Sequence, residues 1–175
     1  MKVKFKKLLP GARLPEKATA GSAAYDLYVP EDTIVKPGRQ TIPLGFAMEM
    51  EEGYEALVDP RSGFSSKGME GHKIADGIYT VETPFGQIEI MDREAYISLD
   101  PHRFDCDVIE GKIDSDYRGS VGVIVHNRDQ RFLIKAGTRI AQMTFHKVET
   151  ADFEEVEELS ESGRDGGFGS TGTKS

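Results

Sequence analysis

The sequence lacks the features of several common protein classes. It contains one cysteine, Cys106, so an internal disulfide is excluded. A single cysteine is compatible with a reducing compartment. No apolar run approaches transmembrane length, and the basic N-terminus, MKVKFKKLLPGARLP, lacks the apolar core of a secretion signal. We therefore expect a cytoplasmic protein with no membrane association.

Basic residues are also in short supply. The 22 lysines and arginines face 30 aspartates and glutamates, which gives a formal net charge of -8 at pH 7. General attraction to nucleic acid or to membrane surfaces is therefore not expected. An anionic ligand would need local arginines or a divalent cation to offset the negative field of the protein.

The signatures of two large catalytic classes are missing. The four histidines, at positions 72, 102, 126 and 146, show no metal-ligand spacing, and there is no H-E-x-x-H. A nucleophile elbow and a Walker lysine are absent too. Zinc and serine-nucleophile mechanisms have no support, and no sequence cue marks Cys106 as a reactive thiol.

Glycine and proline, by contrast, are frequent. With 19 glycines and 8 prolines among 175 residues, turn signals come too often for long helices. The short alternating or β-branched segments between them predict a single all-β domain, an antiparallel sandwich or barrel. The predicted strands cover residues 2–6, 33–35, 39–48, 55–58, 78–81, 87–90, 121–126, 132–134 and 140–148.

Two segments are candidates for helices. Residues 61–67 follow a proline and suit one short helix. In residues 152–158 and just beyond, Phe153, Val156 and Leu159 fit a helical stripe, yet the run is acidic and uncapped. A solvated, extended lead-in to the C-terminus is an equally good interpretation there.

Two stretches carry carboxylates. Residues 114–119, DSDYRG, open like a calcium loop, but the twelfth position is Val125 instead of a glutamate, which excludes that mode. Asp114 and its neighbour Asp116 can serve as a general base and a polar contact, or as ordinary turn residues. In AGSAAYDL, Asp26 is a metal-ligand candidate, although a lone aspartate is more often a surface residue.

Two further stretches carry polar and basic groups. In PRSGFSSKG, Arg61, Ser62 and the start of a short helix can bind an anion, or form an ordinary capped turn. In RIAQM, Gln142 would usually be just a polar strand position. Sequence pattern alone leaves both choices open.

The C-terminal stretch RDGGFGSTG, residues 164–172, matches G-x-G-x-x-G at Gly167, Gly169 and Gly172. A dinucleotide fingerprint needs a following helix and a later acidic residue, and only three residues remain. The stretch is therefore a flexible arm whose N–H groups fold around an anion held by another surface, or a disordered tail.

In their order along the chain, five motifs resemble those of the trimeric deoxyuridine triphosphate nucleotidohydrolases, the dUTPases. They are AYDL (24–27), PRSG (60–63), GKIDSDYRG (111–119), RIAQ (139–142) and GGFGSTG (166–172). The resemblance implies a jelly-roll-like β domain over residues 1–160 and a C-terminal arm over 161–175. It also implies a homotrimer in which the arm closes over an active site of a neighbouring subunit.

The implied reaction is the hydrolysis of dUTP to dUMP and pyrophosphate, which limits uracil incorporation into DNA and supplies dUMP for dTMP synthesis. By resemblance, Asp114 activates the water that attacks the α-phosphorus and also contacts the sugar 3'-hydroxyl. Gln142 holds the same water or nearby phosphate oxygens. Tyr117 packs under the deoxyribose and excludes a 2'-hydroxyl, and Asp26 reaches Mg²⁺ through water.

The remaining implied roles concern the base and the phosphates. Backbone groups of the hairpin from Val108 to Ile113 read uracil, and Phe168 of the arm stacks on it. The implied phosphate contacts and further arm residues at the substrate are Arg61, Ser62, Gly63, Arg164, Gly169, Ser170 and Thr171.

Three features depart from the family pattern. The arm arginine is often five residues before the phenylalanine, where this chain has Gly163, so the register of Arg164 differs by one. Ala24 replaces a glycine usual before Tyr-Asp-Leu. The segment of about 69–107 is an unusual insertion, which we interpret as a hairpin followed by the loop LDPHRFDCD, residues 99–107, serving as structural decoration or as a partner-binding elaboration.

Two other functions compete with dUTP hydrolysis. The dCTP deaminases share the fold but attack the cytosine ring, and the DSDYRG and GGFGSTG motifs favour the pyrophosphatase. A nucleotide-sensing or protein-interaction module would keep the pocket without turnover. The presence of all the candidate catalytic side chains argues against it.

Overall fold

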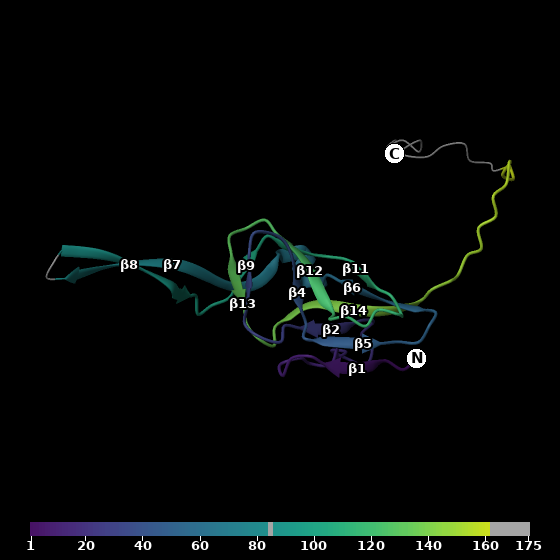
Figure 1. The fold of residues 1–175 in the computed structure, drawn as a ribbon, viewed down its shortest axis with the longest axis horizontal. Helices are drawn as coiled ribbons and strands as arrows, with labels where there is room; N and C mark the ends of the chain where they lie inside the picture. The colour runs from purple at the N-terminus through teal and green to yellow at the C-terminus, as the bar shows by residue number, and fades with distance from the viewer. Residues whose placement is uncertain (84–85, 162–175) are drawn as a thin grey trace.

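The structure is a computed structural model that describes the backbone of residues 1–83 and 86–161 (Figure 1). The described part is almost entirely β. Its one helix, α1, spans Ser62–Lys67. The strands are β1 (Lys4–Lys7), β2 (Tyr25–Tyr28), β3 (Thr33–Val35), β4 (Gly38–Pro43), β5 (Phe46–Glu49), β6 (Tyr54–Asp59), β7 (Met69–Thr83), β8 (Gly86–Ile97), β9 (His102–Phe104), β10 (Cys106–Ile109), β11 (Gly111–Ile113), β12 (Gly122–Asn127), β13 (Phe132–Ile134) and β14 (Arg139–Lys147).

The strands form antiparallel sheets whose order differs from their order in the chain. The body holds a sheet in the order β11-β6-β14-β2 and another in the order β10-β12-β4, and β1 pairs with β5. A further sheet runs β3-β13-β7-β8, with β9 paired to the base of β7. Residues far apart in sequence are thereby placed side by side, which is what brings the motifs into pockets.

One hydrophobic cluster holds the body together, because alternate residues of facing sheets point into it. In β12, Val123 and Val125 are buried, whereas Ile124 between them is exposed. Near the base of β7, Phe104 stacks on Phe132 with ring centroids 4.1 Å apart. Burial of such side chains is the main favourable term in folding, and the sheets therefore pack as a sandwich.

Two segments leave the body, at opposite ends (Figure 1). The β7–β8 hairpin projects as a long two-stranded ribbon. Only its base pairs with other strands, since β7 meets β9 from Met69 to Gly71 and β13 at His72 and Lys73. At the other end the chain after β14 continues in an extended form, without helix, as far as residue 161.

Most predicted strands are confirmed, and those of the body have bounds shifted by one or two residues. The two strands predicted at 78–81 and 87–90 are much longer in the structure, where β7 begins at Met69 and β8 ends at Ile97. The predicted strand 39–48 is divided into β4 and β5, because Gly45 adopts a φ of 70° between them. The predicted helix 61–67 is confirmed as α1, and the predicted hairpin of the insertion as β7–β8. Residues 152–158 are extended, which decides between the two interpretations of that segment.

One prediction about the insertion is wrong. Residues 99–107 are not a loop, because β9 and the first half of β10 lie within them. Phe104 and Cys106 face the core there, and the intervening Asp105 and the following Asp107 are both paired with Arg128. In the part of the chain that the structure describes, no helix has the length and apolarity that crossing a membrane requires.

Candidate functional site

The first group of predicted site residues surrounds a pocket of about 230 Å³ where β11 ends. Asp114 follows Ile113, the last and buried residue of β11, so the strand fixes where the carboxylate begins. The lining also includes Tyr117, Ser120 and Gly122. The Asp114 carboxylate is exposed and makes no hydrogen bond or ion pair with any residue that the structure describes. It is therefore free to accept a proton from a water molecule or from a ligand hydroxyl.

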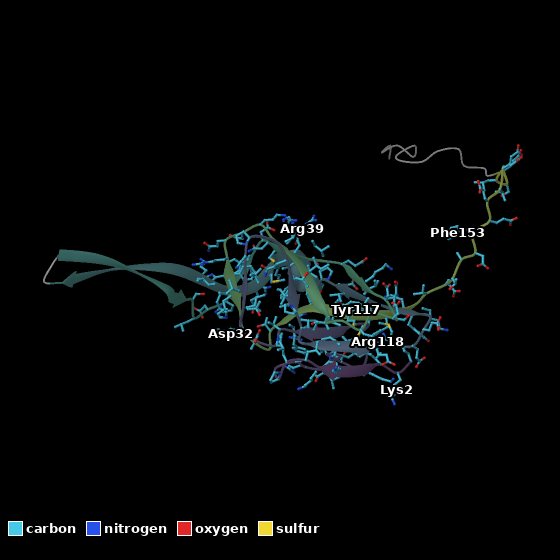
Figure 2. All side chains as sticks on the ribbon, viewed as in Figure 1. Lys2, Asp32, Arg39, Tyr117, Arg118 and Phe153 are labelled. Atoms are coloured by element: carbon cyan, nitrogen blue, oxygen red, sulfur yellow. The ribbon has the colours of Figure 1, made fainter. Side chains whose placement is uncertain are left out.

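Local hydrogen bonds hold the turn that carries Asp114 and Tyr117. The Tyr117 N–H donates to the Asp114 carbonyl at 3.1 Å, and the Tyr117 hydroxyl donates to the Ser120 carbonyl at 3.0 Å. Arg118 Nη1 donates to the carbonyls of Ser115 and Tyr117, at 2.6 and 3.0 Å. The side chains of Tyr117 and Arg118 lie close together on this edge of the body (Figure 2). The turn is thus fixed by its own residues, without core packing.

A cation stands beside this pocket. Lys112 of β11 pairs with Glu55 of β6, with Nζ 2.7 Å from Oε2. The hydrogen bond to Glu55, together with the field of nearby carboxylates that include Asp114, raises the pKa of Lys112 above its usual range. Lys112 therefore stays protonated at any physiological pH. Its positive charge offsets part of the negative charge at the pocket.

The second group of predicted residues lines a separate, polar pocket of about 330 Å³. Its side chains come from the loop before β2, from β2 itself, from the start of α1 and from β14. Arg61 is the N-cap residue of α1, but its side chain makes no capping hydrogen bond. The helix is short because Gly68, at a φ of 79°, ends it, and Phe64 anchors it in the core. The lining includes Asp26, Arg61, Ser62, Gly63, Arg139 and Gln142.

Asp26 is the centre of this second pocket. Its side chain is only 12% exposed, and both carboxylate oxygens meet arginines. Arg61 Nε lies 3.3 Å from Oδ1, and Arg139 Nη1 donates to Oδ2 at 3.0 Å. Arg61 Nη1 also donates to the Arg139 carbonyl at 3.2 Å. Asp26 therefore aims two guanidinium groups at one pocket, an arrangement suited to a polyanion.

The predicted Mg²⁺ contact of Asp26 can be tested against this geometry. Asp26 already accepts from two arginines, and no three metal-ligating side chains gather among the residues that the structure describes. Mg²⁺ usually keeps several waters and binds through substrate phosphates together with one or two carboxylates. The described residues therefore fit an ion that a triphosphate would carry, with Asp26 as the one carboxylate near it, and they form no direct protein cage.

The two pockets share no residue, and strand register explains why. Ile113 lies opposite Ala56 of β6, so Asp114 lies level with Glu55, whereas Gln142 lies opposite Asp59. Four residues of strand separate these levels, about 13 Å, and β11 and β14 flank β6 on opposite sides, about 10 Å apart. Two groups bound to one water can be only about 6 Å apart. Asp114 and Gln142 of one chain therefore cannot hold the same water.

The other predicted residues have different positions. The expected hairpin from Val108 to Ile113 is wrong, because β10 pairs with β12 and β11 pairs with β6, in different sheets. Val108 is buried in β10 and lines a third pocket, of about 430 Å³, whose walls include Arg39 and His126. Arg164, Phe168, Gly169, Ser170 and Thr171 lie outside the described residues. Sequence reasoning gave Arg139 no role, because its partner Asp26 is 113 positions away and only the pairing of β14 with β2 brings them together.

Cys106 is a structural thiol and not a surface one. The thiol is buried in β10, and burial raises its pKa to about 12, with Asp107 and Asp105 adding to the shift. Because the thiolate is the reactive form, Cys106 does not act as a nucleophile at neutral pH.

Comparisons with known proteins agree with these features. The dUTPase family model matches residues 11–91 and 105–172. The chain is 39% identical to the deoxyuridine 5'-triphosphate nucleotidohydrolase of Nautilia profundicola, over 98% of this chain and 99% of that protein. It is 37% identical to the enzyme of the same name from Wolinella succinogenes, over 98% and 95%.

Solved structures give the fold. The dUTPase of Staphylococcus bacteriophage 80alpha with dUpNHpp superposes with a TM-score of 0.72 at 24% identity, over 98% of both chains. A point mutant of the dUTPase from phage phi11 of S. aureus, described with a structural Mg(II) ion, has a TM-score of 0.66 at 20% identity, over 91% of this chain and 99% of that chain. The fold is thus the all-β, jelly-roll-like fold expected from the motifs. With a family model that matches most of its length and relatives this similar, the chain belongs to the dUTPase family.

Proposed function

We propose that the protein hydrolyses dUTP to dUMP and pyrophosphate, with a water molecule attacking the α-phosphorus. The observation that carries the proposal is the free carboxylate of Asp114 at the mouth of a pocket lined by Tyr117, in a chain whose relatives are named for this reaction. The water oxygen bonds to the α-phosphorus, its proton passes to Asp114, and the bond from that phosphorus to the bridging oxygen of the β-phosphate breaks. Pyrophosphate leaves, and no oxidant or reductant is needed.

The two pockets take different parts of the substrate. The pocket beside Asp114 takes the deoxyribose against Tyr117 and the uracil against backbone groups between Val108 and Ile113. The pocket around Asp26 takes the triphosphate, which Arg61, Ser62 and Gly63 contact, while Gln142 orients the water or a phosphate oxygen. Two guanidinium groups supply the positive charge that an acidic protein needs to bind a polyanion.

The active site is completed between subunits of a homotrimer. The separation of Asp114 from Gln142 along β6 supports this, because one water is within reach of both only if they belong to different copies. The segment after β14 also supports it. That segment leaves the body, and its apolar residues Phe153 and Leu159 are 98% and 88% exposed (Figure 2). Such exposure is unfavourable for an isolated copy and suits contact with a neighbour.

The residues that follow this segment form the arm. Residues 161–175 close over the site of a neighbouring copy, with Phe168 on the uracil and with Arg164, Gly169, Ser170 and Thr171 toward the phosphates. Residues 1–160 are the β domain that positions everything else. A segment that already points away from its own body supports this division.

Mg²⁺ accompanies the triphosphate and would neutralise charge that develops on the phosphates. Asp26 would hold it through water, while Arg61 and Arg139 would bind the phosphate oxygens directly. The proposed role is cytoplasmic, keeping dUTP low so that uracil does not enter DNA and supplying dUMP for dTMP synthesis.

The first test measures pyrophosphate release from each deoxynucleoside triphosphate with Mg²⁺ present. Efficient release from dUTP alone is expected. Ammonia release from dCTP would show a deaminase instead, and binding of dUTP without turnover would show a nucleotide sensor.

The second test asks whether the site lies between subunits. Asp114→Asn and Gln142→Ala are co-expressed with different tags, and the mixed assemblies are purified through both tags. Each variant alone is expected to be inactive, whereas every mixed trimer regains one intact site, about a third of wild-type turnover. Mixed assemblies as inactive as the single variants would contradict a shared site.

A further inference from the structure

The ring of Tyr117 lies against a residue that has no side chain. A Cβ atom built on Gly119 would be 2.5 Å from Cζ and 3.0 Å from Cε2 of Tyr117, and closer still to its hydroxyl oxygen. Apart from the adjoining residues of the chain, these three atoms of the Tyr117 side chain are the nearest neighbours that such a Cβ would meet. The backbone of Gly119 is not in the left-handed region, so backbone conformation does not require a glycine there. Space for the Tyr117 ring does.

Little else holds this ring. Tyr117 is 46% exposed and belongs to no buried cluster, and its hydroxyl donates one hydrogen bond, to the Ser120 carbonyl. A methyl group at position 119 would therefore displace the ring instead of the backbone, because the far end of an exposed side chain is the cheapest part to move. The displaced hydroxyl would lose its bond to Ser120.

We propose that Gly119 is a positioning residue that sets the Tyr117 ring and thereby the choice between deoxyribose and ribose. The proposal rests on the proposed function, in which the Tyr117 ring leaves no room for a 2'-hydroxyl. Gly119 itself touches no substrate. It acts by leaving space for the ring beside position 119, with the Tyr117 hydroxyl donating to the Ser120 carbonyl.

Arg118 fixes the backbone on which this contact depends. Its guanidinium holds the carbonyls of Ser115 and Tyr117, so residues 115–117 cannot shift easily to accept a larger residue at 119. The three atoms nearest to a Cβ at Gly119, outside its chain neighbours, all belong to the Tyr117 side chain, which is exposed enough to rotate. A loss of selectivity is therefore expected, and a loss of the fold is not.

The experiment compares Gly119→Ala with Gly21→Ala, which adds a methyl group where no atom lies within 4 Å and where φ is also ordinary. The ratio of kcat/KM for dUTP to kcat/KM for UTP is measured for both. We expect Gly119→Ala to lower this ratio by about 10- to 100-fold. This is the discrimination that a pocket typically achieves against one extra hydroxyl group, and it is lost when the ring moves. Gly21→Ala should leave the ratio unchanged. An unchanged ratio in Gly119→Ala overturns the proposal.

A double-mutant cycle separates this route from a general disturbance of the turn. In the Tyr117→Ala background, Gly119→Ala should change the ratio no further, because the ring through which it acts is gone. An equal drop in that background overturns the proposal.

A readout that does not depend on turnover keeps this inference separate from the proposed function. With the 6 tyrosines replaced by 3-fluorotyrosine, the Tyr117 signal is assigned by its absence in Tyr117→Phe. Gly119→Ala should move this ¹⁹F signal, and Gly21→Ala should not. If the wild-type protein fails to hydrolyse dUTP, the proposed function falls, and with it the link to sugar choice. A ¹⁹F signal that stays in place shows that Gly119 does not set the ring.

Discussion

The turn at residues 114–120 and the cluster around Asp26 serve the same proposed reaction, yet different interactions hold them. The turn is closed by hydrogen bonds within seven residues, from Tyr117 to Ser120 and from Arg118 to Ser115. The cluster joins β2, the start of α1 and β14 through one carboxylate. A local device can be altered without disturbing the fold, whereas a long-range one connects chemistry to stability. Matched substitutions in the two regions should therefore separate activity from stability.

The largest effect is expected for Asp114→Asn. Loss of the proposed general base should lower kcat for dUTP by about 10²- to 10⁴-fold, while dUTP still binds. The melting temperature should not fall, because the carboxylate has no partner among the described residues. Steady-state kinetics, a binding titration and calorimetry check the three parts. A near-normal kcat would remove Asp114 from the mechanism.

The same change at Asp26 should act differently. Asp26→Asn removes the charge between two arginines in a site where the carboxylate is largely buried, although Arg139 is nearly half exposed. We expect a loss of about 1–3 kcal/mol of unfolding free energy, reduced by solvent screening at Arg139. That corresponds to a melting temperature lower by about 2–10 °C, measured at fixed protein concentration.

Activity should fall in this variant as well, because Arg61 would no longer be held toward the proposed phosphate pocket. KM should rise together with any fall in kcat. An Asp26→Asn protein as stable as the wild type would show that the two regions do not differ in the way proposed.

The arginines of the two regions provide a finer test. Lysine keeps the charge but loses the planar fork that reaches two acceptors. Arg118→Lys should loosen only the turn. The loss of one or two hydrogen bonds there should lower kcat/KM by about 3- to 10-fold, and the melting temperature should not change. Arg139→Lys should lower the melting temperature measurably. Equal thermal shifts in the two variants would count against the comparison.

This contrast also explains which parts were visible in the sequence. Strands such as β12 and β13 alternate or are β-branched, so periodicity reveals them. Strand β2 was missed because Asp26 and Leu27 are both buried, which breaks the alternation. The sequence predicts a loop for the first half of β10 because Asp105 and Asp107 look like turn residues, and their partner Arg128 lies about twenty positions away.

The site follows the same division. Motifs name individual residues such as Asp114, Arg61 and Gln142, since each sits in a recognisable local pattern. Their placement in two pockets depends on the register of β11 and β14 on β6, which no local pattern contains. The support of Asp26 by Arg139 and the fit of Tyr117 over Gly119 are likewise tertiary contacts, so they become visible only in the folded chain.

The smallest effect is expected for the β7–β8 ribbon, which belongs to neither region. Removal of residues 72–104 would also delete β9, with its buried Phe104, and the part of β7 that pairs with β13. A cleaner deletion removes residues 75–97 and joins Ile74 to Ser98 by Asn-Gly, a sequence favoured in tight hairpin turns. The two cut ends already lie close together, because the Ser98 N–H donates to the Lys73 carbonyl at 3.0 Å.

This deletion should leave kcat, KM and the mass of the assembly unchanged within error, because both pockets lie in the body and none of their lining residues is removed. Steady-state kinetics and light scattering measure these quantities, and the deletion of 72–104 serves as the destabilised reference. A slower enzyme with an unchanged mass would mean that the ribbon takes part in catalysis. A change of mass would mean that the ribbon takes part in assembly. The ribbon would then be a third functional region, beside the turn at 114–120 and the cluster around Asp26.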